Sequence, residues 1–255
     1  MNTDLRVLVV SCIVFQMAQQ LCGINAVFYY STSFFNGVLS NPLLGTNLVA
    51  FVNVIATYVA LKLMDRTARR TLLLISAGGM LVSTVFIVMA VKGYFPNTIA
   101  LISVMAYVSF FEIGLGPIPW LIVAEMFDSK YVATAMSLSC ILNWFCNFLV
   151  GLLFPFMKLY LGTWSFMPFG AVLIATLSFT WLYLPETYGR SVDEIQRLVQ
   201  DPFYEVVYMY MTYYMLYVYT HYYTYAICVC CLCVVLVIFI ADSQTDDDDV
   251  WLLYL

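Results

Sequence analysis

"TLLLISAGGMLVSTVFIVMAVK", residues 71–92, carries one charged side chain, and it stands at the last position. A run of about 20 apolar residues is long enough to cross the hydrocarbon core of a bilayer as a helix. Similar runs occupy residues 7–36, 44–64, 97–121, 131–157 and 163–184. The sequence therefore predicts an all-α membrane protein, a six-helix transmembrane bundle, with a candidate seventh apolar segment at 222–241.

The composition supports this class. The 255 residues are 64% hydrophobic and 10% charged, whereas soluble domains carry about 25% charged residues. A soluble chain of this length could not hide so much apolar surface. The strands of a membrane barrel would alternate in hydrophobicity with a period of two, and the sequence shows no such alternation.

Basic residues set the expected orientation, because loops rich in Lys and Arg stay in the cytoplasm. In the alternating topology, Lys92 and Lys158 fall on one side and the other eight of the ten Lys and Arg residues on the opposite side. Those eight are Arg6, Lys62, Arg66, Arg69, Arg70, Lys130, Arg190 and Arg197. We therefore expect residues 1–5 and 185–200 to be cytoplasmic, and the run after Arg6 to act as a signal anchor.

Enzymatic and nucleic-acid functions find no support in the sequence. The chain has one histidine, no phosphate-binding glycine loop, no basic patch and no nucleophile–base pair, so we expect no enzyme, no cofactor and no nucleic-acid partner. "CVCCLC", residues 228–233, lies in a continuous apolar run, whereas metal sites usually place thiolates on turns. We expect these cysteines to serve as small apolar side chains, with palmitoylation and a metal site as the less favoured alternatives.

Amide side chains stand where a lipid-facing helix would be apolar. "QQLCGINAVFYYS", residues 19–31, contains Gln19, Gln20 and Asn25, and further amides occur in other runs. These are Asn53, Asn143 and Asn147. Polar groups in a span either hydrogen-bond neighbouring helices or face a watery cavity. Gly23 predicts a helix break that turns the amides toward one cavity, where their paired donors and acceptors would suit a neutral polyhydroxyl ligand.

A second polar group lies in "FFEIGLGPIPW", residues 110–120. Pro117 and Pro119 interrupt the backbone hydrogen bonds of a helix. Glu112, Gly116 and Trp120 are spaced by four, so we expect them near one face, with the Trp at the kink acting as a gate over a sugar ring. A packing kink with an interfacial Trp is the alternative.

Five motifs in chain order carry a resemblance to a known family. They are residues 19–31, "DRTARR" at 65–70, "GPIPW" followed by "AE" at 124–125, "NWFCN" at 143–147 and "PETYGR" at 185–190. Over residues 1–200 the chain resembles the C-terminal half of the sugar porters of the major facilitator superfamily, which include facilitative glucose transporters and hexose symporters.

The resemblance implies which residues bind sugar and which form a cytoplasmic gate. The implied sugar-binding residues are Gln19, Gln20, Asn25, Asn53, Glu112, Trp120 and Asn143. The implied gating network is Asp65, Arg66, Arg69, Arg70, Glu125, Glu186 and Arg190. Taken alone, the charge run at 65–70 would also fit a solvated positive-inside loop. The sequence departs from the family pattern at Ala68 in place of Gly, Leu115 in place of a frequent Pro, and Tyr188 in place of a common Lys.

The family has twelve spans in two halves, with substrate between them, and this chain resembles one half. We therefore expect a fragment or an incomplete gene product whose partner, in cis or in trans, is an N-terminal half. Residues 201–255 form a Tyr-rich and Cys-rich apolar tail without a family motif. The predicted function is transport of a hexose-like sugar by alternating access across the plasma membrane. The alternative is a half that binds sugar or a partner subunit without transporting, or an inactive product.

Overall fold

The computed structural model describes residues 3–35 and 41–199. Within these ranges every regular element is a helix, and there are no strands. The elements are α1 (Thr3–Leu21), α2 (Ile24–Phe35), α3 (Pro42–Met64), α4 (Arg69–Val91), α5 (Asn97–Ile113), α6 (Ile118–Met126), α7 (Val132–Leu161), the 3-10 turn η1 (Gly162–Trp164), α8 (Met167–Tyr183) and α9 (Val192–Val199). The tail at 201–255 and its candidate seventh segment lie outside the described residues.

Five segments of the described part are long and apolar enough to cross a membrane. They are Leu8–Tyr29, Pro42–Met64, Arg69–Val91, Thr98–Met126 and Val132–Trp164. The sixth predicted span, 163–184, contains the shorter α8 of 17 residues, about 26 Å at 1.5 Å per residue. This helix begins later than predicted because Gly162, at φ 54°, ends α7 and η1 follows it.

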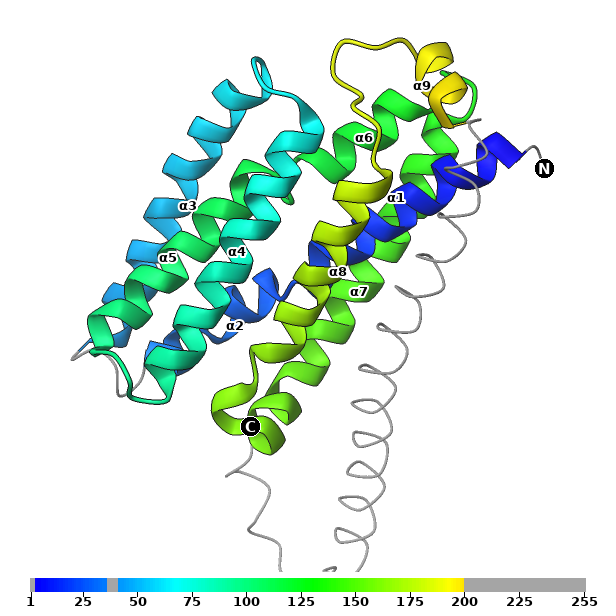
Figure 1. Ribbon diagram of the computed structural model, residues 1–255. Coiled ribbons are helices and arrows are strands. Elements are labelled where there is room, and N and C mark those ends of the chain that lie inside the picture. The colour runs from blue at the N-terminus through cyan, green and yellow to red at the C-terminus, as the bar shows by residue number, and fades with distance from the viewer. Residues whose placement is uncertain (1–2, 36–40, 200–255) are drawn as a thin grey trace, which may run out of the picture.

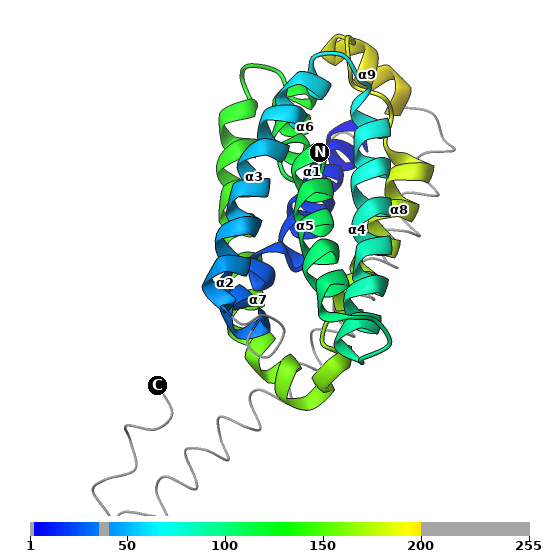
Figure 2. The same cartoon turned by 90° about the vertical axis from the view of Figure 1, so that its left-hand side faces the viewer.

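The helices form two neighbouring groups. In the first group α5 packs between α3 and α4, and α4 also packs against α8 (Figure 2). In the second group α1 packs against α6, α7 and α8, while α2 packs against α3 and α7 (Figure 1). The fourth predicted span therefore changes groups along its length, since α5 belongs to the first group and α6 to the second.

The packing separates an apolar interior from an apolar outer surface. Inside, the rings of Phe15 and Phe179 meet edge-to-face with centroids 5.4 Å apart, and both side chains are fully buried. Large apolar side chains on the outer faces, such as Phe51 and Trp144, are more than half exposed. An apolar surface of this extent is typical of a protein that contacts lipid or another membrane segment.

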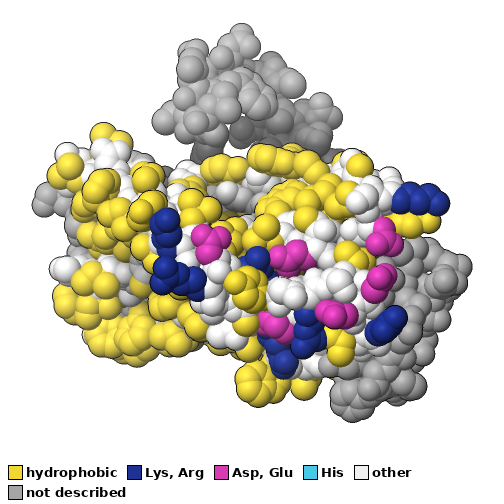
Figure 3. All heavy atoms as spheres, turned by 90° about the horizontal axis from the view of Figure 1, so that it is seen from above, with side chains coloured by type: hydrophobic (Ala, Val, Ile, Leu, Met, Phe, Trp, Pro, Cys, Tyr) yellow, Lys and Arg dark blue, Asp and Glu magenta, His cyan; other side chains and the backbone are white. Residues whose placement is uncertain are grey.

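Charged side chains gather at one end of the bundle, where α9 and the loop between α3 and α4 lie (Figures 1 and 3). Arg66, Arg69, Arg70 and Glu125 belong to this end. Lys92 lies at the opposite end, where its ammonium group is 3.2 Å from the centroid of the Trp164 ring. The two ends therefore differ in charge as the sequence predicts.

The predicted break at Gly23 is confirmed. Helix α1 ends at Leu21 and α2 begins at Ile24, and Gly23 has φ 89°, a conformation that residues with a side chain rarely adopt. A Cβ at this position would also lie 2.4 Å from the ring of Phe169. Both the backbone angle and the available space therefore require glycine.

The second break goes further than predicted. Instead of one kinked helix, the span divides into α5 and α6, so Glu112 and Trp120 do not share the face of one helix. The reason is that Pro117 and Pro119 have no N–H to donate to the carbonyls four residues earlier. Gly114 allows the unwound chain to approach α4, because a Cβ there would lie 2.6 Å from the carbonyl oxygen of Leu72.

Candidate functional site

The two breaks face a cavity of about 490 Å³, lined by residues of α1, α2, α3, α5, α6 and α7. This volume falls within the roughly 300–1,000 Å³ range of small-molecule pockets. Six of the seven predicted sugar-binding residues line it, namely Gln19, Gln20, Asn25, Glu112, Trp120 and Asn143. Trp120 lines the pocket together with Glu112 and Gly116 even though the helix is interrupted between them. The cavity also includes Leu61 and Trp144, which are exposed, so it reaches the surface of the bundle.

The amides form one hydrogen-bonded chain centred on Asn143. Its Nδ2 donates to Gln16 Oε1 at 2.8 Å and to Gln19 Oε1 at 2.6 Å. Its Oδ1 accepts from Gln20 Nε2 at 2.8 Å, and Gln20 Oε1 accepts from Asn25 Nδ2. These hydrogen bonds between the amides are thus already formed before a ligand binds. A ligand could bond to Gln20 and Asn25, whose side chains are only partly buried.

Gln19 has a second set of partners, on the broken span. Its Nε2 donates to the carbonyl of Leu115 at 2.9 Å and to the carbonyl of Gly116. Both hydrogens of the amide nitrogen are used by these bonds, and the side chain is 4% exposed. In this arrangement only Oε1 of Gln19 retains capacity for a ligand hydroxyl.

Glu112 is held by two residues of α3. Asn53 Nδ2 donates to Glu112 Oε1 at 2.9 Å and Thr57 Oγ1 donates to Oε2 at 3.0 Å. Thr57 lines the cavity, whereas Asn53, the seventh predicted residue, does not. The structure therefore places Asn53 beside Glu112, in a position to orient its carboxylate, and not on the wall of the cavity.

Two polar residues of the site were missed by the sequence analysis. Gln16 is fully buried and bonds Asn143, and Thr57 bonds Glu112. A signal for each was present, since Gln16 precedes Gln20 by four residues and Thr57 follows Asn53 by four. That spacing places each pair on one helix face. Asn147, on the same face as Asn143, lies outside the cavity and accepts from Tyr29 Oη at 3.2 Å.

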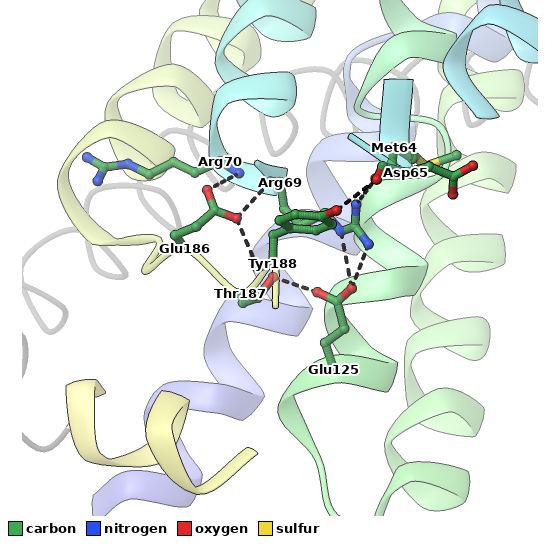
Figure 4. A network of polar contacts seen from close by, with 8 residues as sticks. All are labelled: Met64, Asp65, Arg69, Arg70, Glu125, Glu186, Thr187 and Tyr188. Carbon is green, nitrogen blue, oxygen red and sulfur yellow. Dashed lines mark hydrogen bonds and ion pairs between the residues drawn. The ribbon is translucent and has the colours of Figure 1, made fainter. Parts of the chain in front are cut away.

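At the charged end, Arg69 and Glu125 form an ion pair between α4 and α6 (Figure 4). Arg69 Nε and Nη2 each lie 3.1 Å from Glu125 Oε1, and Nη1 donates to the carbonyl of Met64. The other carboxylate oxygen of Glu125 accepts from Thr187 Oγ1 at 2.6 Å. The pair is mostly buried, with side chains 12% and 24% exposed, so salt screens it less than a surface pair.

Glu186 caps the N-terminus of α4 from the loop that follows α8. Its Oε1 accepts from the backbone N–H of Arg69 at 2.7 Å, and its Oε2 accepts from that of Arg70 at 3.2 Å. The first N–H groups of a helix have no partner within it, and the helix dipole favours a negative charge there. The Ala68 side chain makes no such cap, so the cap comes from a distant part of the chain.

Tyr188 and Ala68 show how the two departures at this end are accommodated. Tyr188 Oη donates to the Asp65 carbonyl at 2.7 Å, and the Arg69 guanidinium lies 4.8 Å from the centroid of the Tyr188 ring. Ala68 has φ −55° and ψ 134°, which any L-residue adopts without strain. The loop therefore does not need a glycine at this position.

Not every predicted gating residue joins this cluster through its side chain. Arg69, Glu125 and Glu186 contribute side chains to it, whereas Arg70 takes part through its backbone N–H and Asp65 through its backbone carbonyl. Arg66 and Arg190 are exposed, and no side-chain bond joins either of them to the cluster within the described ranges. The alternative of a solvated positive loop applies to Arg66, which belongs to the charge run at 65–70. In the same ranges no three His, Cys, Asp or Glu side chains are placed to hold a metal ion together.

Comparison with known proteins identifies the relatives of this chain. A family model described as "Sugar (and other) transporter" matches residues 1–199. The mouse (Mus musculus) protein "Solute carrier family 2, facilitated glucose transporter member 3" is 45% identical over 190 residues, which cover 72% of this chain and 38% of the mouse protein. The human (Homo sapiens) counterpart is 43% identical over 194 residues, covering 74% and 39% respectively.

Solved structures agree with these relatives. The crystal structure of a D-xylose-proton symporter matches with a TM-score of 0.67 and 27% identity, over 72% of this chain and 44% of the symporter. The inward-open xylose transporter XylE from E. coli matches with a TM-score of 0.67 and 27% identity, over 75% and 41%. This chain spans less than half the length of these relatives. It is a multi-pass integral membrane protein and belongs to the "Sugar (and other) transporter" family of the major facilitator superfamily, whose members are transporters and not enzymes.

Proposed function

We propose that residues 1–200 supply the sugar-binding C-terminal half of a porter that moves a hexose-like sugar across the plasma membrane by alternating access. The observation that carries the proposal is the cavity lined by Gln20, Asn25, Glu112, Trp120 and Asn143. Neutral amides and one carboxylate offer the mixture of donors and acceptors that sugar hydroxyls need. Trp120 adds a flat apolar face suited to the C–H groups of a sugar ring.

The surface opening of the cavity fits a half-transporter. In the family the substrate lies between two six-span halves, and this cavity reaches the surface at Leu61 and Trp144. A second half placed against that opening would close it. We infer that an N-terminal half, in cis or in trans, is the partner of this chain.

The cluster around Arg69 and Glu125 would act as the inner gate. It joins α4, which packs with α5, to α6, which packs with α1 and α7, so a movement between the two helix groups must break it. With this end in the cytoplasm, as the basic residues favour, an intact cluster would stabilise the state closed to the inside. Residues 185–200 would then be cytoplasmic, and residues 201–255 would form a separate tail.

The name of the mouse relative refers to glucose and that of the symporter to D-xylose, so a hexose or a pentose is the expected substrate class. The alternative function is a subunit that binds sugar or a partner without transporting. The chain spans less than half the length of the relatives that it matches.

Sugar uptake and sugar binding together test the proposal. The full chain is expressed in cells that lack glucose uptake, alone or with the N-terminal six spans of a facilitated glucose transporter, and D-glucose uptake is measured. Binding of D-glucose is measured in parallel on the purified chain in lipid nanodiscs. Uptake that requires the companion half supports the porter. Binding without uptake in either case supports the subunit, and the absence of both D-glucose uptake and D-glucose binding contradicts the porter and a sugar-binding subunit.

A further inference from the structure

The peptide of Leu115, in the middle of the second helix break, is held from two helices. Its N–H donates to Ser76 Oγ on α4 at 3.0 Å, and its carbonyl accepts from Gln19 Nε2 on α1 at 2.9 Å. Leu115 and Ser76 are both fully buried. Buried peptide groups outside a helix need partners of this kind, because a lost bond leaves a desolvated polar group.

Because of where this peptide lies, its two bonds can influence the shape of the pocket. The break is the point where the span leaves the group of α3, α4 and α5 and enters the group of α1, α6 and α7. Gly116, Pro117 and Trp120 follow directly and line the cavity. Whatever fixes the Leu115 peptide therefore also fixes where the second half of the span begins.

The approach to α4 is close enough to make the Ser76 bond specific. At Gly114 a Cβ would lie 2.6 Å from the Ser76 Cβ and 2.6 Å from the Leu72 carbonyl oxygen. The chain thus passes against α4 with no space for another side chain. Ser76 itself does not line the cavity, so any effect that it has on a bound sugar must act through the break.

We propose that Ser76 is a positioning residue for the sugar pocket, which it sets by holding the Leu115 peptide so that α6 presents Gly116 and Trp120 to the cavity. This inference rests on the proposed function. It depends on a feature of this chain, because a proline at position 115, frequent in the family that the sequence resembles, has no N–H to donate. The hydroxyl of Ser76 and the N–H of Leu115 are the two partners of one hydrogen bond, so removing either should weaken sugar binding to the same extent.

A double-mutant cycle tests this equivalence on the full chain in lipid nanodiscs. The variants are Ser76→Ala, Leu115→Pro and the two combined. Ser83→Ala is the matched control, because Ser83 is a buried serine of the same helix whose hydroxyl donates to Gly79 within that helix. Two quantities are measured. The first is D-glucose affinity in every variant. The second is hydrogen exchange of peptides covering 114–120 in the variants that retain Leu115; Pro117 and Pro119 contribute no amide signal there.

We expect Ser76→Ala to accelerate exchange of the Leu115 amide and to weaken D-glucose binding by about twofold to tenfold. Leu115→Pro should weaken binding to a similar extent. The combined variant should bind D-glucose no more weakly than whichever single variant binds it less tightly. Ser83→Ala should match the wild type in both measurements.

Unchanged exchange in Ser76→Ala, wild-type affinity, or losses of affinity that add in the combined variant would each overturn the proposal. A wild-type chain that binds no D-glucose would contradict the proposed function. In that case faster exchange in Ser76→Ala would still support the hold on the Leu115 peptide, and unchanged exchange would overturn it.

Discussion

The side-chain amide of Gln19 donates to the carbonyl of Leu115 at 2.9 Å, the carbonyl that Pro119 leaves without its helical donor. Irregular backbone is tolerated within a membrane protein where other groups satisfy it. One amide of the proposed sugar site thus also stabilises the broken helix beside it. The Tyr107 hydroxyl donates to the Cys22 carbonyl at the first break, so each interrupted span is capped by a side chain of the other.

Gln19→Ala and Gln20→Ala should have different effects. Gln19→Ala leaves the Leu115 carbonyl unpaired, so it should lower the free energy of unfolding by about 1–3 kcal/mol. Gln20→Ala should cost less stability, because Asn143, whose Oδ1 loses its donor, lines the cavity and can be reached by water, and it should weaken D-glucose binding by roughly tenfold to a hundredfold. Thermal unfolding in detergent and binding in nanodiscs measure the two effects. Wild-type affinity in Gln20→Ala, combined with poor expression, would show that this amide only joins helices.

Glu125→Gln should loosen the proposed inner gate. The substitution removes the charge that pairs with Arg69 but retains the shape of the side chain, and a hydrogen bond to a charged group contributes about 1.5–3 kcal/mol. In a transporter completed with an N-terminal half, we expect faster labelling of Leu61→Cys by a thiol reagent applied from the charged end. Arg190→Gln, at an exposed position outside the cluster, is the control. Equal labelling rates in the two variants would count against the gate.

Tyr188→Phe should have a smaller effect in the same assay. It removes the hydroxyl that bonds the Asp65 carbonyl but keeps the ring against Arg69. The loss of one exposed hydrogen bond should shift the equilibrium between the closed and open states by about twofold to fivefold toward the open state. Tyr188→Leu removes both contacts and should shift the equilibrium further. If the two variants behave alike, the hydroxyl accounts for the whole effect and the ring contact contributes nothing.

The proposed orientation can be tested with two engineered thiols at exposed positions on opposite ends of the bundle. Ser129→Cys lies in the loop between α6 and α7, at the charged end, and Thr163→Cys lies in η1. In intact cells an impermeant maleimide should label Thr163→Cys and spare Ser129→Cys, because positive loops remain in the cytoplasm. The reverse labelling pattern would invert the orientation.

Much of the architecture followed from local sequence. Long apolar runs predicted the helices because an isolated backbone in lipid must satisfy its own hydrogen bonds. Gly23 predicted the first break, since it changes the backbone directly, whereas the prolines at 117 and 119 predicted a kink where the structure has a complete interruption. The ends of the last span were less well predicted, because the turn at Gly162 shortens it.

The partners of the polar side chains were decided by the tertiary structure alone. Sequence spacing relates residues within one helix, so it placed Asn143 among the candidates but could not show that it joins Gln16, Gln19 and Gln20. Likewise the sequence placed Asn53 among the candidate sugar contacts but could not show that its side chain bonds Glu112.

The sequence by itself determined the membrane helices, the break at Gly23, a kink at Pro117 and Pro119, and most of the polar residues that lipid would not tolerate. The tertiary structure decided which of those residues cap the backbone, as Gln19 and Glu186 do, and which remain able to meet a ligand. The physical reason is that a buried donor or acceptor must be paired, and the partners of these site residues lie about 60 to 130 positions away in the sequence.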